Sequence, residues 1–378
     1  MVDMLLLAFT TVIALITLVV ALDNFFHAPR LENTGKRKIP VASAYPFVSV
    51  LIPARNEEKN IAACIDAASV QTYPHMEIVV LDDDSSDTTL EIVHKYSKTA
   101  KPGSVCGFRL IRGKRLPPGW TGKNWACFQL AQEACGDVIL FIDADVVLAP
   151  HAVQTAVSGM QAYKADILSC FPVQITCSFG EMLIVPMMQW ILLAFLPLKL
   201  VFESKNPAFS AANGQFLMFS KHVYQKIGTH AAFKDNVAED IEMVRSAKKA
   251  GFLPVTAVSG KNTVVCRMYR NFLEAYQGFA KNFYPATNVH LLVFMVLMVF
   301  VTVVYFLPFI LMLFDMVFIV PVLFLLTSAG IIRVVSGNNI VRNIFLFPLQ
   351  IVLLLSIGLY SAYVTSTRRA VWKGRKLP

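Results

Sequence analysis

Long apolar runs at both ends of the chain enclose a middle region of mixed composition, and this arrangement restricts the fold more than any other feature. The first run, Met4–Leu22, is interrupted only by threonines, and three more apolar runs lie between Asn288 and Val364. At about 1.5 Å per residue, runs of this length can cross the hydrocarbon core of a bilayer. The sequence therefore predicts a membrane protein with a polar domain between its apolar ends.

The charge distribution supports a membrane partner and argues against nucleic acid. Only 16% of the 378 residues are charged and 56% are hydrophobic, with a net charge of +9. From Met316 onward there are basic residues and no acidic ones. These basic residues flank apolar runs, which is how membrane topology is specified, whereas a nucleic-acid binder gathers them on a folded polar face.

The first apolar run is expected to be an anchor, because it exceeds the apolar core of a signal peptide and lacks a basic start and a cleavage site. Arg30, Lys36, Arg37 and Lys38 follow it, so the next domain should be cytoplasmic. The expected organisation is an anchor, a basic linker, a catalytic domain, a C-terminal transmembrane region and a basic cytoplasmic tail, at residues 1–24, 25–44, 45–287, 288–364 and 365–378.

Two apolar segments need separate interpretation. Phe179–Phe202, broken by prolines and polar residues, predicts a pair of interfacial helices, with a buried core helix as the alternative. Three C-terminal crossings would leave the tail outside the cell, although its five basic residues indicate the inside. We therefore expect one C-terminal segment, near Pro308, Pro321 or Pro348, to be re-entrant or merged with another.

The middle region alternates short apolar runs with polar helical stretches. The predicted strands are Phe47–Ile52, Glu77–Leu81, Phe108–Ile111 and Val138–Ile142, and the predicted helices are Glu57–Gln71, Thr88–Ser97 and Asn124–Ala134. Continuous apolar strands separated by helices indicate an α/β domain, with a mostly parallel sheet covered on both faces.

The seven cysteines form neither a CxxC pair nor a cluster with histidines. This spacing predicts no zinc site and no disulfide framework, so free thiols in a reducing compartment are expected.

Aspartate clusters follow two of the predicted strands. The segment 82–84 is Asp-Asp-Asp, and Asp143 and Asp145 follow the strand VILFI. In open α/β sheets ligands bind beyond the carboxyl ends of the strands, and such carboxylates suit a hard divalent cation. Aspartate is also common after strands because it forms turns, so the pattern alone leaves both interpretations open.

The order of further motifs resembles the family 2 glycosyltransferases over nearly all of Val48–Lys281. The matching segments are Pro53–Glu58, Glu77–Thr89, Asp143–Asp145, Ala212–Gly214 and Glu239–Asp240, although Asp84 stands where the family usually has glycine. The resemblance implies a GT-A fold, which is Rossmann-like, and inverting transfer of a sugar from a nucleotide donor.

Two shorter segments resemble a membrane-bound subgroup that glycosylates lipids, including bacterial carotenoid-acid glycosyltransferases. They are Pro117–Trp125 (PPGWTGKNW) and Trp372–Arg375 (WKGR). The resemblance implies transfer of one hexose from a UDP-sugar, with UDP-glucose as the expected donor, to a carotenoid or terpenoid acid or alcohol. Polyprenyl-phosphate, glycerolipid or sphingolipid acceptors remain alternatives, as does a non-catalytic membrane scaffold.

The same resemblance assigns roles at the donor end and at the reaction centre. Nucleotide-sugar binding is expected of Ala54, Glu57, Asp82, Asp83, Lys123 and Asp143, with Lys123 on the diphosphate. Asp145 is the expected ligand of Mg²⁺ or Mn²⁺. Asp240, next to Glu239, is the expected base, although a carboxylate acceptor would need only to be oriented.

The acceptor side is expected to include Trp120, Asn213, Gly214, His230, Arg267, Arg270, Gln277 and Lys281. The polymer-forming members of the family carry Q-x-x-R-W, whereas residues 277–281 here read QGFAK. This departure favours one sugar per acceptor. Arg267 and Arg270 are candidates to replace the missing cation or to hold an acidic headgroup, with ordinary surface arginines as the alternative.

Overall fold

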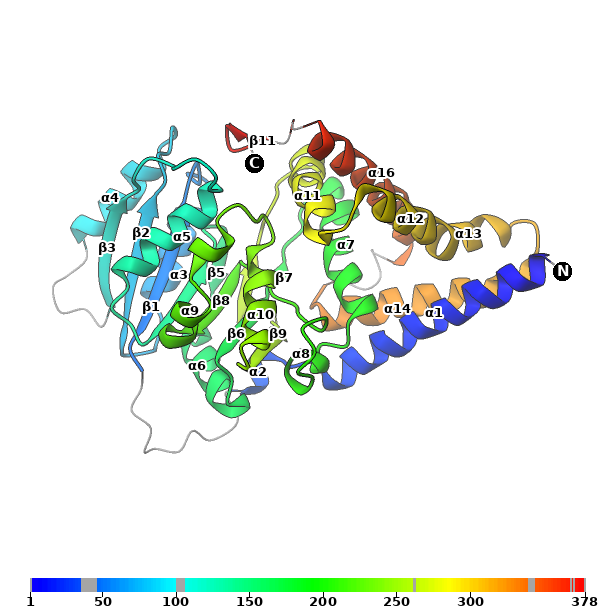
Figure 1. The fold of residues 1–378 in the computed structure, drawn as a ribbon, viewed down its shortest axis with the longest axis horizontal. Coiled ribbons are helices and arrows are strands. Elements are labelled where there is room, and N and C mark those ends of the chain that lie inside the picture. Colours follow the sequence, from blue (N-terminus) through cyan, green and yellow to red (C-terminus); the bar gives the residue numbers. More distant parts are fainter. Residues whose placement is uncertain are drawn as a thin grey trace.

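The structure is a computed structural model that describes residues 2–34, 46–99, 106–260, 263–338, 344–367, 369 and 371–376. A polar α/β domain lies at one end of the molecule and long apolar helices extend from it toward the other end (Figure 1). The N-terminus lies at the far tip of these helices, whereas the C-terminal segment returns to the polar domain (Figure 1).

A seven-stranded sheet in the order β3-β2-β1-β4-β8-β6-β9 forms the centre of the polar domain. β8 is antiparallel to β4 and β6, and the other neighbours are parallel. The strands are β1 (Val48–Ala54), β2 (Met76–Asp82), β3 (Cys106–Arg112), β4 (Val138–Ile142), β6 (Ile167–Phe171), β8 (Phe216–Ser220) and β9 (Pro254–Val258). The mostly parallel sheet predicted from the sequence is confirmed.

Helices cover both faces of this sheet, as continuous apolar strands require. Along β1, Val50 and Ile52 pack toward the first helix layer, whereas Leu51 packs toward the second. The first layer is α3 (Ile61–Ser69), α4 (Thr89–Thr99) and α6 (Ala152–Tyr163). The second layer is α5 (Gly122–Glu133), α9 (Lys221–Lys226), η1 (His230–Phe233) and α10 (Glu239–Lys249).

A small second sheet, in the order β5-β10-β7, extends the domain next to the carboxyl end of β4. Its strands are β5 (Val146–Leu148), β7 (Val173–Gln174) and β10 (Val264–Cys266). β5 begins directly after the Asp143–Asp145 segment, so this sheet holds one side of the loop that carries both aspartates.

Among the described residues, four helical segments are long and apolar enough to cross a membrane: Met4–His27, Leu291–Leu311, Met316–Val335 and Phe347–Ser366. They comprise α1 (Val2–His27), α12–η2–α13 (Leu291–Val301, Thr302–Phe306, Leu307–Leu311), η3–α14 (Met316–Phe318, Ile319–Val335) and α16 (Phe347–Ser366). α1 and α14 run side by side (Figure 1). The Thr17 hydroxyl of α1 is 2.9 Å from the Tyr305 hydroxyl of η2.

The segment Phe179–Phe202 forms two helices, α7 (Phe179–Phe195) and α8 (Lys199–Glu203), as the sequence predicted. The turn between them is fixed by Asn24 of α1, whose Nδ2 donates to the Leu193 and Leu196 carbonyls at 2.9 Å. The anchor is thereby joined to the polar domain. Whether α7 lies in the surface of a bilayer stays a prediction.

Both ends of α16 lie near the polar domain. Its start follows α14, where Asn338 donates to Gln189 of α7 at 2.9 Å, and near that start Gln350 donates to the Met182 carbonyl at 2.8 Å. Toward its end, Ser361 accepts from the backbone of Tyr284, in α11 (Phe272–Thr287), at 2.8 Å. Beyond α16, the hairpin of β11 (Val371–Trp372) and β12 (Arg375–Lys376) contacts the polar domain.

Candidate active site

Parallel strands bring the predicted carboxylates to one edge of the sheet. β1 lies between β2 and β4, and Ala54 at the end of β1 is in register with Asp82 at the end of β2. Asp143 follows β4 at the same edge. The Ala54 carbonyl accepts from the backbone N–H of Asp83 at 2.8 Å, which fixes the loop after β2. These residues therefore lie where the sequence predicted, beyond the carboxyl ends of parallel strands.

Lys123 stands between two groups of carboxylates. It lies in the first turn of α5, where the Thr121 side chain caps the helix by accepting from Asn124 N–H at 3.2 Å. Its Nζ is 2.8 Å from Asp143 Oδ1 and 3.9 Å from Glu239 Oε1. Burial opposes the charge on Lys123, but these carboxylates have the larger effect and raise its pKa, so the amine stays cationic. It lies at the N-terminus of α5, where the helix dipole also favours anions.

Asp240 lies close to Lys123 and is held by backbone donors. Its Oδ2 accepts from Gly214 N–H at 2.8 Å and its Oδ1 accepts from Ile241 N–H at 2.8 Å. A Cβ at position 214 would lie 3.0 Å from Lys123 Nζ, so glycine allows the close approach. Burial raises the pKa of Asp240, and burial together with the nearby Asp240 charge raises the pKa of Glu239 to about 7.

Asp145 has the properties of a cation ligand. Its Oδ1 is buried without a hydrogen-bond partner. Burial, followed by the charges of Asp143 and Glu57, raises its pKa to about 7. Within the described part of the chain no group of three or more His, Cys, Asp or Glu side chains could hold a metal. The oxygen donors of Asp145 and Asp143 thus fit a hard divalent cation only if further ligands come from elsewhere, such as a diphosphate.

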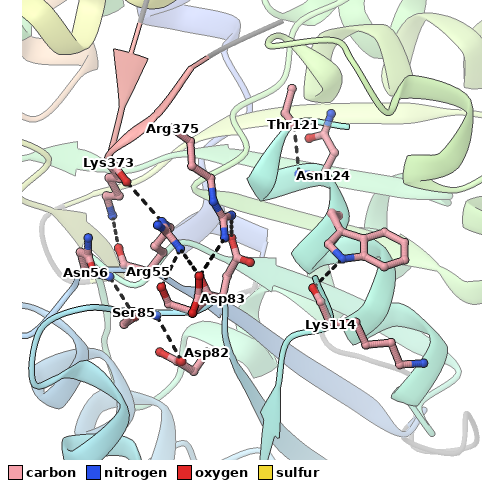
Figure 2. A network of polar contacts seen from close by, with 12 residues as sticks. Arg55, Asn56, Asp82, Asp83, Ser85, Lys114, Thr121, Asn124, Lys373 and Arg375 are labelled. Atoms are coloured by element: carbon pink, nitrogen blue, oxygen red, sulfur yellow. Dashed lines mark hydrogen bonds and ion pairs between the residues drawn. The ribbon is translucent and has the colours of Figure 1, made fainter. Parts of the chain in front are cut away.

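The nucleoside end of the predicted site is covered by the C-terminal hairpin. Figure 2 shows Arg375 reaching Asp83, and Arg55 lying between Asp83 and Lys373. Lys373 Nζ donates to the Arg55 carbonyl at 2.8 Å and to Glu57. Arg55 Nε donates back to the Lys373 carbonyl at 3.2 Å. The two carboxylates expected to recognise the nucleoside, Glu57 and Asp83, therefore already pair with cations of the tail.

The turn of this hairpin explains how both cations point to one side. Lys373 and Gly374 have φ of 46° and 78°, and Trp372 pairs with Arg375 across the turn. Two successive positive φ angles define the tight hairpin turn whose twist matches the strands. Arg375 also lies against the start of α5, where a Cβ on Gly122 would be 2.8 Å from its Nη1.

The two arginines expected on the acceptor side have structural partners. Arg267 pairs with the buried Glu181 at 3.0 Å, and Glu181 also closes the capping box of α7. Arg270 Nη2 donates to Asn60 Oδ1 at 2.8 Å and to the Lys59 carbonyl at 3.1 Å. Because both guanidiniums are engaged by the protein, the expectation that they hold a headgroup or diphosphate does not fit this geometry.

His230 was expected to line the acceptor cleft, and its place in the core contradicts this. Its ring packs 4.9 Å from the ring of Phe141, and its Nδ1 lies 2.7 Å from the Tyr224 hydroxyl. Burial, followed by the charge of Lys123, lowers its pKa to about 3. The histidine is therefore a neutral packing residue of the second helix layer.

The other residues expected on the acceptor side lie at different distances from the reaction centre. Gly214 and Asn213 lie beside Asp240, and the Asn213 Oδ1 accepts from Gln215 N–H at 2.9 Å. Trp120 is half-buried against Trp125 and Phe128 near the start of α5.

On α11, Gln277 is exposed, whereas Lys281 lies within the field of the site. Burial, then the charges of Lys123 and Lys373, lowers the pKa of Lys281 to about 7.

The tail residues Lys373 and Arg375, and Arg55 in the first loop, were not assigned to the site from the sequence. The WKGR segment and the basic tail were visible, but they were interpreted only as a subgroup resemblance and a topology signal. Their carboxylate partners lie far away in the chain, so no local spacing could reveal the pairing.

Part of this chain matches a known protein family. Residues 49–228 match the family described as Glycosyl transferase family 2. These residues, just under half of the chain, are therefore similar to a family 2 glycosyltransferase domain. The resemblance and the GT-A fold expected from the motifs are confirmed, and the domain boundaries and the individual residue roles stay predictions.

Two curated relatives match part of this chain. It is 28% identical over 232 residues to 4,4'-diaponeurosporenoate glycosyltransferase of Staphylococcus aureus (strain USA300), covering 61% of this chain and 58% of the relative. The protein of the same name from Staphylococcus haemolyticus (strain JCSC1435) is 28% identical over 239 residues, covering 62% of this chain and 60% of the relative. The alignments thus span under two thirds of these relatives.

A solved mannosyltransferase from Pyrobaculum calidifontis, in complex with GDP-Man and Mn²⁺, has the same fold. The structures superpose with a TM-score of 0.52 at 16% sequence identity, covering 96% of this chain and 99% of that one. At this identity the likeness concerns the fold alone.

Proposed function

We propose that this glycosyltransferase moves one hexose from a UDP-sugar, with UDP-glucose as the first candidate, to a membrane lipid acid or alcohol with inversion at the anomeric carbon. The observation that carries the proposal is the position of Lys123, which pairs with Asp143 at 2.8 Å and lies 3.9 Å from Glu239, the neighbour of Asp240. A cation beside the leaving diphosphate and a carboxylate on the opposite side are what an inverting displacement needs.

In this mechanism the acceptor oxygen attacks the anomeric carbon opposite the bond to the diphosphate, and that bond breaks as the new one forms. Lys123 stabilises the charge that develops on the leaving diphosphate. Asp240, oriented by Gly214 and Ile241, accepts the proton of a hydroxyl acceptor. A carboxylate acceptor has no proton to lose, and Asp240 then only positions it.

Asp145 and Asp143 are the residues that would hold Mg²⁺ or Mn²⁺, as argued from the unpartnered oxygen of Asp145. A divalent cation at these carboxylates supplies neutralising charge at the diphosphate. The same two carboxylates repel each other without it, which is consistent with the raised pKa of Asp145.

Two observations support a lipid acceptor. The described chain has four helices suited to a bilayer, and α7 and α11 connect these helices to the catalytic domain. The relatives named above are glycosyltransferases of 4,4'-diaponeurosporenoate, a carotenoid acid. An acceptor dissolved in the membrane and a donor dissolved in water meet only at such a boundary. Polyprenyl phosphate is the second candidate acceptor.

We further propose three membrane crossings with the catalytic domain in the cytoplasm. α1, α12–η2–α13 and α14 cross, whereas α16 starts and ends on the side of the catalytic domain. Three crossings leave the N-terminus outside and the basic tail inside, which removes the conflict between helix count and charge. α16 is then the re-entrant segment expected near Pro348.

The test is turnover by the purified protein in detergent with UDP-glucose, Mg²⁺ or Mn²⁺ and 4,4'-diaponeurosporenoate, with product detected by mass spectrometry. Asp145→Asn is expected to lower kcat/KM at least about a hundredfold, because one carboxylate of a cation site is lost. The matched control, Asp137→Asn, changes an exposed aspartate at the other end of β4 and should retain activity.

Parallel reactions with polyprenyl phosphate and with GDP-mannose identify the acceptor and donor classes. Absence of turnover with every pair, together with unchanged nucleotide affinity in Asp145→Asn, would reject the enzymatic proposal in favour of a scaffold.

A further inference from the structure

A polar cluster is buried where the helix bundle meets the catalytic domain. Arg333, in the last turn of α14, is 1% exposed, and its Nη2 donates to Gln350 Oε1 of α16 at 2.9 Å. Gln350 is fully buried and donates in turn to the Met182 carbonyl of α7 at 2.8 Å. Gln350 is thereby fixed from a third helix, and it orients the guanidinium of Arg333.

Most of the donors in this cluster have no acceptor in the described structure. Arg333 Nε and Nη1 are buried without a partner, and so is the hydroxyl of Ser336. Ser336 follows Arg333 by three residues, which places the two side chains on neighbouring positions of one helix face. Burying a guanidinium that has a single amide partner costs free energy, whether the surroundings are protein or lipid.

Nearby, a further donor is unsatisfied. The indole Nε1 of Trp190 is buried without a partner, and its ring lies 5.3 Å from that of Phe347, three residues before Gln350. Buried polar groups in native proteins are nearly always hydrogen-bonded, so several donors that are unsatisfied within the described residues point to a ligand rich in acceptor oxygens.

The cluster lies at the end of α14 that adjoins the catalytic domain. Directly beyond it, Gly337 contacts Val173 of the small sheet in the catalytic domain, so this end of α14 is the one nearest to water. The neighbours Val334 and Leu349 are exposed on the outside of the bundle. Arg333 is therefore buried, whereas the residues next to it and next to Gln350 in the chain are exposed.

We propose that Arg333 and Ser336, oriented through Gln350, bind the anionic oxygens of a membrane-lipid headgroup. The free edge of the guanidinium offers two N–H directions that match the paired oxygens of a phosphate or carboxylate, and the Ser336 hydroxyl offers a third. The site is separate from the sugar-transfer centre at Asp240, and Arg267 and Arg270 cannot serve it because they are engaged elsewhere.

The test measures lipid binding to the full-length protein in neutral detergent by native mass spectrometry and by thermal unfolding. The probes are phosphatidylglycerol, sodium oleate and phosphatidylcholine. Wild type is expected to retain and be stabilised by an anionic lipid, and Arg333→Gln should need at least about tenfold more of it for the same effect. The exposed Arg369, changed to Gln, is the matched control and should behave like wild type.

Arg333→Gln keeps a donor toward Gln350 and removes an unpaired buried charge, so it is expected to fold and to be at least as stable as wild type without added lipid. A response to phosphatidylglycerol alone assigns a phosphate headgroup, and a response to oleate alone assigns a carboxylate. Equal stabilisation of wild type and Arg333→Gln, equal retention of phosphatidylcholine, or no retained lipid at all would overturn the proposal.

Discussion

The guanidinium of Arg375 pairs with the carboxylate of Asp83, a residue that lies 292 positions earlier in the chain. Asp83 is 4% exposed, and burial raises its pKa despite the opposing charges of Arg375 and Arg55. Without Arg375 this carboxylate would be a buried charge that the nearby Arg55 only partly compensates. The contact thus joins the last residues of the chain to the expected nucleoside site.

We expect Arg375→Ala to release the hairpin, because removing one partner of a largely buried ion pair costs about 3 kcal/mol. Trypsin should then cleave more rapidly after Lys373, as measured from the intact mass of the protein. The KM for the UDP-sugar should rise while the KM for the acceptor stays unchanged, since the contact lies at the donor end. Arg369→Ala removes an exposed guanidinium that donates to the Tyr363 hydroxyl, and it serves as the control. Unchanged cleavage and donor KM in Arg375→Ala would contradict a docked hairpin.

The carboxylates of the reaction centre predict a specific pH dependence. Burial and the Asp240 charge raise the pKa of Glu239 to about 7, and burial also raises that of Asp240. Each carboxyl is protonated below its pKa, so kcat for an alcohol acceptor should increase as pH rises through about 7 and the pair becomes able to accept a proton.

In Glu239→Gln the increase of kcat with pH should occur at lower pH than in wild type. The reason is that Asp240 loses a negatively charged neighbour that disfavours its ionised form. The readout is kcat against pH between about 5 and 9 with saturating donor. Glu133→Gln, at an exposed position in the last turn of α5, should keep the profile of wild type. An unchanged pH dependence of kcat in Glu239→Gln would show that the pair does not control the reaction.

His230 predicts an effect of pH on stability rather than on catalysis. Its folded-state pKa of about 3 lies below the ordinary value of 6.5, so between these values the unfolded chain binds a proton that the folded protein does not. The free energy of unfolding should therefore decrease as pH falls through this window. His230→Phe keeps a ring against Phe141 and should remove this part of the acid sensitivity, at a cost of about 1 kcal/mol for the lost Tyr224 contact.

The measurement is thermal unfolding in detergent at pH 7.5 and at pH 5, with the exposed His94 changed to Phe as the control. His230→Phe should lose less stability than wild type on acidification and should keep its kcat at pH 7.5. A large loss of kcat without a change in acid sensitivity would instead support the acceptor role that the sequence suggested for His230.

The sequence predicts the sheet edge and its carboxylates because their placement follows from local rules. Apolar strands define the sheet, parallel strands end at one edge, and Asp82, Asp143 and Asp145 follow strands directly. Side-chain pairings across the fold follow no such rule. Arg267 pairs with Glu181, which lies 86 residues earlier, so the sequence could not separate a free cation from a structural one.

The same limit applies to the C-terminal tail and to His230. The basic tail was expected on the cytoplasmic side, but its attachment to Glu57 and Asp83 depends on the path of α16, which helix length and hydropathy do not determine. For His230, the neighbouring glycine and threonine indicate a turn but do not say which way the next side chain points. Its contact with Phe141 follows from how η1 packs on the sheet.

The path of α16 gives the last prediction, which concerns membrane topology. If α16 does not cross, Phe314, in the exposed turn between α13 and η3, lies outside the cell and Arg369 lies inside. Single cysteines are introduced at these positions with the exposed Cys135 and Cys177 changed to serine. An impermeant maleimide applied to intact cells should label Phe314→Cys, and should label Arg369→Cys only after permeabilisation.

A separate variant that keeps native Cys135 in the catalytic domain, with Cys177 changed to serine, provides the matched reference, since Cys135 should be labelled like the tail and not like the turn. Labelling of Arg369→Cys in intact cells, with Cys135 protected, would mean that α16 crosses the membrane. Arg375 could then not reach Asp83 in the cell, because a bilayer would separate them. The ion pair and the three-crossing topology therefore require each other, and this single labelling experiment tests both.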